Sequence, residues 1–186
     1  EDAILKELGR ERLHTDQEDY FIHKDLWNLL IRRLCLDYKK ALRDCPDFHK
    51  KGTALFEFAR GSEHGGFKTA FSHLEGDVLQ RAAVLYINVS WEESLRKNRK
   101  RFNPDKPDSI LEHGLSDDKR EKLYRETDWE AVSAKDPRHL EIGAFRVPYA
   151  VMENEDDVTT GRGPALGARL EETLKKLWET YSEVKN

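Results

Sequence analysis

Two short, continuously apolar runs constrain the fold of this 186-residue chain more than any other feature. The first lies at residues 53–61 and the second at residues 82–90, and polar or glycine-containing segments bound each of them. Runs of this length favour strands that are buried on both faces, and the interval from Phe67 to Arg81 is long enough for a helix. A strand, a helix and a second strand in this order predict a parallel sheet.

A third apolar run, at residues 145–152, predicts one more strand. Leucine and aromatic residues recur at helical spacing in residues 24–42 and 164–181, which predicts amphipathic helices there. We therefore expect a single domain with an α/β fold of three layers, α/β/α, in which helices cover both faces of a mostly parallel sheet. The strands of that sheet should include residues near 54–58, 84–89 and 147–152.

Composition restricts the partners and the compartment. The formal net charge is -4, so the chain as a whole has no attraction for nucleic acid, and any anion site must come from a local cluster. Cys35 and Cys45 form no metal-binding pattern; a disulfide between them stays open, although reduced thiols are favoured. No apolar run has the length of a membrane span and no signal peptide is visible, which predicts a cytoplasmic protein with no membrane partner.

One acid, Glu57, lies in the middle of the first apolar run. A buried carboxylate is costly unless a cation or a hydrogen bond compensates it, so this position indicates a functional site. Ligands of parallel sheets collect at the carboxyl ends of the strands, where Arg60 and Ser90 would lie. The alternative is an edge strand in which the side chain of Glu57 faces water.

Charged residues mark two further candidate segments. Residues 16–21 form an acidic, aromatic stretch that is either a solvated turn or a substrate loop. Residues 96–101 are strongly basic and end a predicted helix, whose start at Ser90 and Glu93 has the capping-box pattern. These basic residues either bind an anion or compensate the dipole of their helix.

Residues 61–69 nearly match a phosphate-binding loop. The match fails by one position, because Phe67 separates Gly66 from Lys68. One extra residue turns a helical side chain by about 100 degrees, so this lysine would not point at a phosphate. We interpret the segment as a coincidental match.

In their order along the chain these segments resemble the P-loop nucleoside and nucleotide kinase-like family, and the resemblance covers nearly the whole sequence. Residues 55–61 resemble the family's third strand with its Walker B-type acid. Residues 86–101 resemble the strand and the arginine-rich helix that lead into the lid. Residues 147–154 are similar to the fifth strand and the loop that borders the base of ATP, and residues 15–21 are similar to the acidic acceptor loop of uridine kinase-like members.

The resemblance implies a P-loop NTPase-like sheet and an ATP-dependent kinase-like phosphotransferase. Such an enzyme uses ATP and Mg²⁺, acts on a small molecule such as a nucleoside or nucleotide, and has a lid-like excursion, here at about residues 96–127. The implied catalytic residues are Glu57, which also holds the metal, Asp16 or Asp19 at the acceptor, and Arg96 and Arg99 in the lid. The implied ligand-binding residues are Tyr20, Arg60 and Arg101 at the substrate and Asn154 at the cofactor.

The family's first strand and its phosphate loop, G-x-x-x-x-G-K-[ST], do not occur in this sequence. Residues 1–9 have the pattern of the closing half of a helix, so we expect the natural protein to extend upstream. The alternative is a non-catalytic nucleotide-binding or protein-interaction module that keeps the kinase-like frame. Nucleic-acid binding through residues 96–101 is a weaker option, and the phosphoryl acceptor and the oligomeric state stay open.

Overall fold

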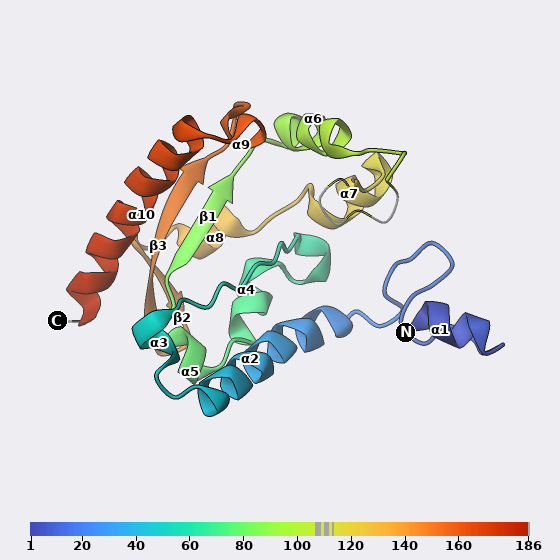
Figure 1. The fold of residues 1–186 in the computed structure, drawn as a ribbon, viewed down its shortest axis with the longest axis horizontal. Helices are drawn as coiled ribbons and strands as arrows, with labels where there is room; N and C mark the ends of the chain where they lie inside the picture. Colours follow the sequence, from blue (N-terminus) through green and yellow to red (C-terminus); the bar gives the residue numbers. More distant parts are fainter. Residues whose placement is uncertain (107–108, 110–111, 113, 186) are drawn as a thin grey trace.

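The computed structural model describes residues 1–106, 109, 112 and 114–185, and about half of the chain is helical. The helices are α1 (Asp2–Glu7), α2 (Leu26–Asp44), α3 (Phe48–Lys51), the 3₁₀ helix η1 (Ser62–His64), α4 (Gly66–Ser72), α5 (Gly76–Leu79), α6 (Trp91–Arg101), α7 (Asp117–Tyr124), α8 (Trp129–Ser133), α9 (Val158–Gly161) and α10 (Pro164–Lys185). The strands are β1 (Val84–Asn88), β2 (His139–Ile142) and β3 (Phe145–Glu153). Figure 1 shows α10 along one side of the sheet and α1 at the far end of the molecule.

The sheet is small and mixed, with the strand order β1-β3-β2. β1 runs parallel to β3, in register from Val84 opposite Tyr149 to Asn88 opposite Glu153. β2 runs antiparallel to β3, and the turn of this hairpin contains Gly143 at φ 59°. The predicted three-layer fold with a mostly parallel, P-loop NTPase-like sheet is therefore wrong, because β1 and β3 form the single parallel pair of strands in the described chain.

The predicted strand at residues 54–58 does not form. Residues 53–60 belong to no strand, and their main chain makes no backbone hydrogen bond to a described residue. Phe56 and Phe58 are half-buried, whereas Leu55 and Glu57 between them are exposed. The buried position expected for Glu57 is therefore not observed, since the alternation of side chains places it on the solvent side.

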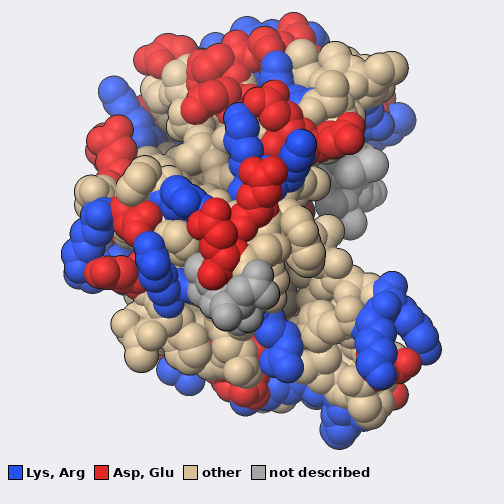
Figure 2. Space-filling view, turned by 90° about the vertical axis from the view of Figure 1, so that its left-hand side faces the viewer, with Lys and Arg blue, Asp and Glu red and all other residues tan. Residues whose placement is uncertain are grey.

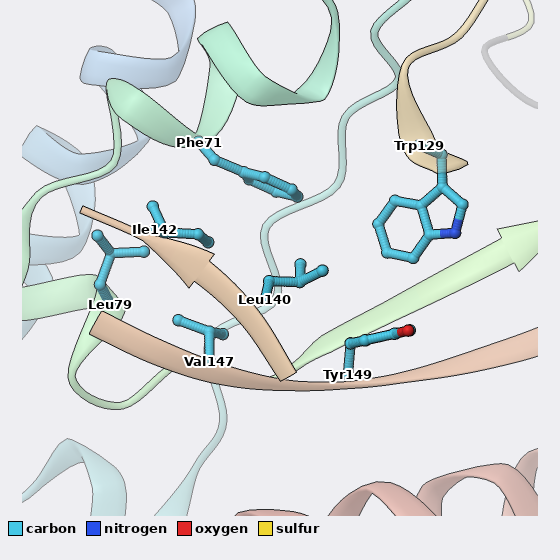
Figure 3. Close-up of a cluster of buried hydrophobic side chains, with 7 residues drawn as sticks. All are labelled: Phe71, Leu79, Trp129, Leu140, Ile142, Val147 and Tyr149. Atoms are coloured by element: carbon cyan, nitrogen blue, oxygen red, sulfur yellow. The ribbon is translucent and has the colours of Figure 1, made fainter. Parts of the chain in front are cut away.

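The main core lies between the sheet and helices α4 and α8 (Figure 3). Trp129 of α8 stacks on Tyr86 of β1 with ring centroids 3.8 Å apart, and it meets Tyr149 of β3 edge-on at 5.5 Å. The other buried members of this cluster are Phe71, Leu79, Leu140, Ile142 and Val147. α10 packs along β3 on the opposite face of the sheet (Figure 1).

A second, smaller cluster joins α2 to α5: Cys35, Tyr38 and Val78 are buried, with Phe56 packed against them. Cys35 and Cys45 are both free thiols, so the disulfide that the sequence left open does not form. None of the described helices combines the length and the apolar character needed to cross a bilayer.

Candidate anion-binding site

Helix α7 and the segment after Arg60 meet at Gly61. A Cβ atom at Gly61 would lie 1.9 Å from the carbonyl oxygen of Leu123, so this approach requires glycine. The amide of Ser62 donates to the carbonyl of Glu126 at 2.8 Å and holds the same contact. This docking brings Arg60 close to α7.

Arg60 is buried, with 3% of its surface exposed, and it forms no ion pair with a described carboxylate. Its Nη1 donates to Oδ1 of Asn28 and to the carbonyl of His64, each at 3.0 Å, and its Nη2 donates to the carbonyl of Trp27 at 2.8 Å. All of these acceptors are neutral, and burial lowers the pKa of Arg60. A buried guanidinium without a counter-charge is costly, which makes this position a candidate for binding an anion.

Arg120 of α7 is a second cation that forms no ion pair with a described carboxylate. Its Nη2 donates to Oγ of Ser94 in α6, and its Nε is buried without a described hydrogen-bond partner. Burial lowers the pKa of Arg120, and the charge of Arg101 acts in the same direction. One turn later, burial raises the pKa of Tyr124, whereas Arg60 and Arg120 both act to lower it. Tyr124 therefore lies within electrostatic reach of the guanidinium groups of both Arg60 and Arg120.

An aromatic pair lies beside Arg60. His64 of η1 stacks on Trp27 of α2 with ring centroids 4.9 Å apart, and the guanidinium of Arg60 lies 5.6 Å from the centroid of Trp27. Nδ1 of His64 and Nε1 of Trp27 are buried and have no described partner, like Nε of Arg120; elsewhere in the described chain only His139 has such an atom. Burial lowers the pKa of His64, so its ring is neutral at pH 7.

Lys119 and Lys122 extend this site to the surface. Their ammonium nitrogens lie 5.0 and 4.1 Å from the ring centroid of Tyr20. Neither lysine forms an ion pair with a described carboxylate, and neither does Arg101. We refer to the whole group as the α7 cation cluster, which consists of Arg60, Arg101, Lys119, Arg120 and Lys122.

Three residues predicted from the sequence lie in or beside this cluster. Arg60 and Arg101 are members of it, and Tyr20 contacts its lysines. The sequence did not single out Arg120 or Tyr124, because α7 is short and charged on most of its surface. The available signal was their spacing, because Arg120 and Tyr124 are four residues apart on one helical face. An acid, Asp117, lies three residues before Arg120, but it forms its ion pair with Arg99.

Asp16 and Asp19, the two acids predicted to bind the acceptor, make different contacts in the loop before α2. Oδ1 of Asp16 accepts the amides of Glu18 and Tyr20, each at 2.9 Å, so Asp16 shapes the turn. Asp19 has a positive φ of 62° and pairs with Arg12 at 2.7 Å. Arg12 lowers the pKa of Asp19, and this carboxylate stays ionised.

Arg96 and Arg99 are both engaged in ion pairs. Arg96 pairs with Glu93 at 2.5 Å and with Asp157 at 2.6 Å, whereas Arg99 pairs with Asp117 at 2.5 Å. These pairs anchor α6 to the start of α9 and to α7, and the role of both arginines as lid cations stays a prediction. The lid-like excursion at about 96–127 contains the second half of α6 and all of α7; residues 107, 108, 110, 111 and 113 lie outside the described chain.

Asn154 and Glu57, the predicted cofactor and metal residues, lie outside the cation cluster as defined. Oδ1 of Asn154 accepts hydrogen bonds from Lys97 at 2.5 Å and Thr159 at 2.7 Å. Glu57 is exposed, and in the described parts of the chain no group of three His, Cys, Asp or Glu side chains is arranged to hold a metal ion. Their predicted roles toward ATP and Mg²⁺ stay predictions.

The segment that nearly matches a phosphate loop already holds an anion of the protein itself. Gly65 and Gly66 have φ values of 81° and 65°, and the amides of Phe67 and Lys68 donate to the carboxylate of Asp128 at 2.6 and 3.0 Å. A Cβ atom at Gly66 would lie 2.3 Å from this carboxylate. The glycines therefore serve an internal contact between α4 and the start of α8.

Comparison with known proteins yields no relative. The sequence matches no family model, and neither the curated proteins nor the solved structures include a match. The resemblance to P-loop kinases therefore stays a prediction from sequence, and the sheet that it implied is not observed.

Proposed function

We propose that the α7 cation cluster binds a phosphate-bearing small molecule. The observation that carries this proposal is the buried guanidinium of Arg60 beside the half-buried Arg120, neither of which forms an ion pair with a described carboxylate. Arginine matches the oxygen geometry of phosphate and forms charge-assisted hydrogen bonds to it. Lys119 and Lys122 would add charge where the ligand reaches the surface.

The location of these cations favours a small ligand over nucleic acid. Nucleic-acid sites present exposed basic stripes, whereas Arg60 is buried. On the face that carries α10, acidic and basic side chains are interspersed (Figure 2), and the net charge is -4. The cations around α7 that form no ion pair with a described carboxylate are thus a local feature, which suits a compact anion.

A second candidate is an ATP-dependent phosphotransferase that acts on a small molecule and uses Mg²⁺. The contact of Tyr20 with Lys119 and Lys122 favours it, because it places the acidic loop beside the cation cluster. Asp19, ionised and within electrostatic reach of Lys119, would bind an acceptor hydroxyl there. The free thiols are consistent with the reducing cytoplasm, where ATP is abundant, and we propose that location.

Calorimetric titration with inorganic pyrophosphate and with ATP tests the binding proposal. Arg120→Gln should weaken the binding of either probe by about tenfold or more, since it removes a charge-assisted contact. Arg125→Gln is the matched control, because Arg125 follows the same helix and pairs with Glu121. Equal affinity in both variants, or no binding at millimolar concentration, would contradict the proposal.

Phosphotransfer is tested separately. The chain is incubated with ATP, Mg²⁺ and a panel of nucleosides, and the release of ADP is measured. Release that depends on one nucleoside and on Mg²⁺ supports an enzyme. Binding of ATP without such release supports the non-catalytic module.

A further inference from the structure

Residues 53–60 have the side-chain pattern of a strand but no strand beside them. Ala54, Phe56 and Phe58 are half-buried, whereas Leu55, with 91% of its surface exposed, and Glu57 point away. This alternation is that of a pleated strand, and Gly52 and Gly61 at its two ends are also extended. The main chain of the segment nevertheless makes no backbone hydrogen bond to a described residue.

The neighbouring sheet has an open edge as well. β1 pairs with β3 on one side and with no described strand on the other. Its sequence, Val-Leu-Tyr-Ile-Asn, contains none of the charges or prolines that usually protect an edge, and Ile87 is 50% exposed. An uncharged edge of this kind is a template for another strand.

Both open edges border the same core. Phe58 packs against the main cluster, as does Tyr86 of β1, and the rings in between form a chain. Phe58 lies 6.1 Å from Phe71, Phe71 lies 5.9 Å from Phe67, and Phe67 lies 5.9 Å from Tyr86, measured between centroids. On the other face, both segments expose an aliphatic side chain, Leu55 and Ile87.

The two segments also begin at one cavity. Lys50, just before the extended segment, and Arg81, just before β1, line a cavity of about 320 Å³ together with Leu42, Pro46, Asp47 and His49. Asp47 pairs with Lys51, and His49 bonds to the hydroxyl of Tyr38. Lys50 and Arg81 form no ion pair with a described carboxylate, so this end of the two edges is positively charged.

We propose that these edges accept an extended peptide strand that is apolar on both faces and has an acidic residue at the end near Lys50 and Arg81. Main-chain hydrogen bonds to β1 and to residues 53–60 would hold it, and its alternating side chains would meet the aromatic core on one face and the two exposed aliphatic residues on the other. The strand must be free on both edges. Each of the three strands in the described chain already has a paired edge, so none of these strands in a second folded copy satisfies this requirement.

Hydrogen exchange measured by mass spectrometry tests this inference. The probe is a synthetic peptide with two leading acids followed by five alternating valine and isoleucine residues and a solubilising tail. We expect slower exchange in residues 54–58 and 84–88 together. The same peptide with alternate amides N-methylated should protect neither segment, since it lacks the donors that pairing requires.

A charge exchange gives the second arm of the test. Arg81→Glu should weaken binding of the acid-led peptide about tenfold and strengthen binding of a lysine-led version, and circular dichroism should show that the variant is folded. The proposal is overturned if the acid-led peptide at millimolar concentration protects neither segment, or if the N-methylated peptide protects equally. Protection that rises with protein concentration in the absence of peptide would assign the edges to self-association instead.

Discussion

The carboxylate of Asp128 fixes the start of α4, and its removal should be costly although it lies outside the hydrophobic core. It accepts the amide of Phe67 at 2.6 Å and that of Lys68 at 3.0 Å, while Gly65 at the N-cap offers no side chain. In Asp128→Ala the part-buried amide of Phe67 loses its partner, at a cost of about 1.5–3 kcal/mol. The exposed amide of Lys68 regains water and adds only about 0.5 kcal/mol.

These contributions predict a free energy of unfolding that is lower by about 2–3.5 kcal/mol, or a melting temperature lower by roughly 4–14 °C for a chain of this size. Urea titration followed by tryptophan fluorescence measures this free energy of unfolding. Asp128→Asn keeps one acceptor oxygen, so its stability should fall between that of the unchanged protein and that of Asp128→Ala. Asp25→Ala is the matched control, because Asp25 precedes α2 without a side-chain hydrogen bond to it. If Asp128→Ala costs no more than this control, the proposed role of the carboxylate is wrong.

Further predictions concern the docking of α7, the buried histidine and the exposed acid. Gly61→Ala should lower the free energy of unfolding by more than about 2 kcal/mol and weaken pyrophosphate binding, because the added Cβ would clash with the carbonyl of Leu123. Gly167→Ala should instead stabilise α10 by about 0.5–1 kcal/mol in the same urea titration, because the added Cβ meets no other atom. The pKa of His64 lies below its ordinary value of 6.5 in the folded chain, so the unfolded chain binds more protons and stability should fall as the pH drops below that value. Thermal melts between pH 8 and pH 5 should show this slope, and His64→Gln should flatten it. Glu57→Gln should change the free energy of unfolding by less than about 0.5 kcal/mol, and a larger loss would mean that Glu57 has a partner in the folded chain.

The apolar periodicity of the sequence predicted those helices and strands whose pattern lies entirely within their own residues. α2 and α10 have long apolar stripes, and the strands near 84–89 and 147–152 are runs of apolar residues, so each was found close to its observed bounds. Ser90 caps α6 through the amide of Glu93, as the capping-box pattern predicted. These signals are local, and no partner elsewhere in the chain is needed to produce them.

Strand pairing could not be predicted in the same way. The apolar pattern of residues 53–60 is that of a strand, and the structure keeps its alternation, but a strand also needs a neighbour, which the pattern does not specify. Conversely, β2 is only four residues long and contains two polar residues, so its pattern was too weak to detect. β2 therefore pairs with β3 in an antiparallel hairpin, where the sequence had led us to expect a mostly parallel sheet that included residues 54–58.

The cation cluster shows why an anion site is partly hidden in the sequence. The chain has 36 acidic and 32 basic residues, so carboxylates are available for pairing. Arg96, Arg99 and Arg125 each form an ion pair with at least one carboxylate. These pairs are exposed to solvent, where an ion pair adds little to the stability of the fold. Arg60 and Arg120 are more enclosed, and neither forms an ion pair with a described carboxylate. A counter-charge would nevertheless stabilise an enclosed guanidinium more than an exposed one. Arg120 and Tyr124 already share helix α7, but Arg60 comes close to them only because Gly61 docks on that helix. The site therefore depends on a tertiary contact between segments about 60 residues apart. A phosphate bound between Arg60 and Arg120 would supply the negative charge that no described ion pair gives them. The same interaction would stabilise the docked position of α7.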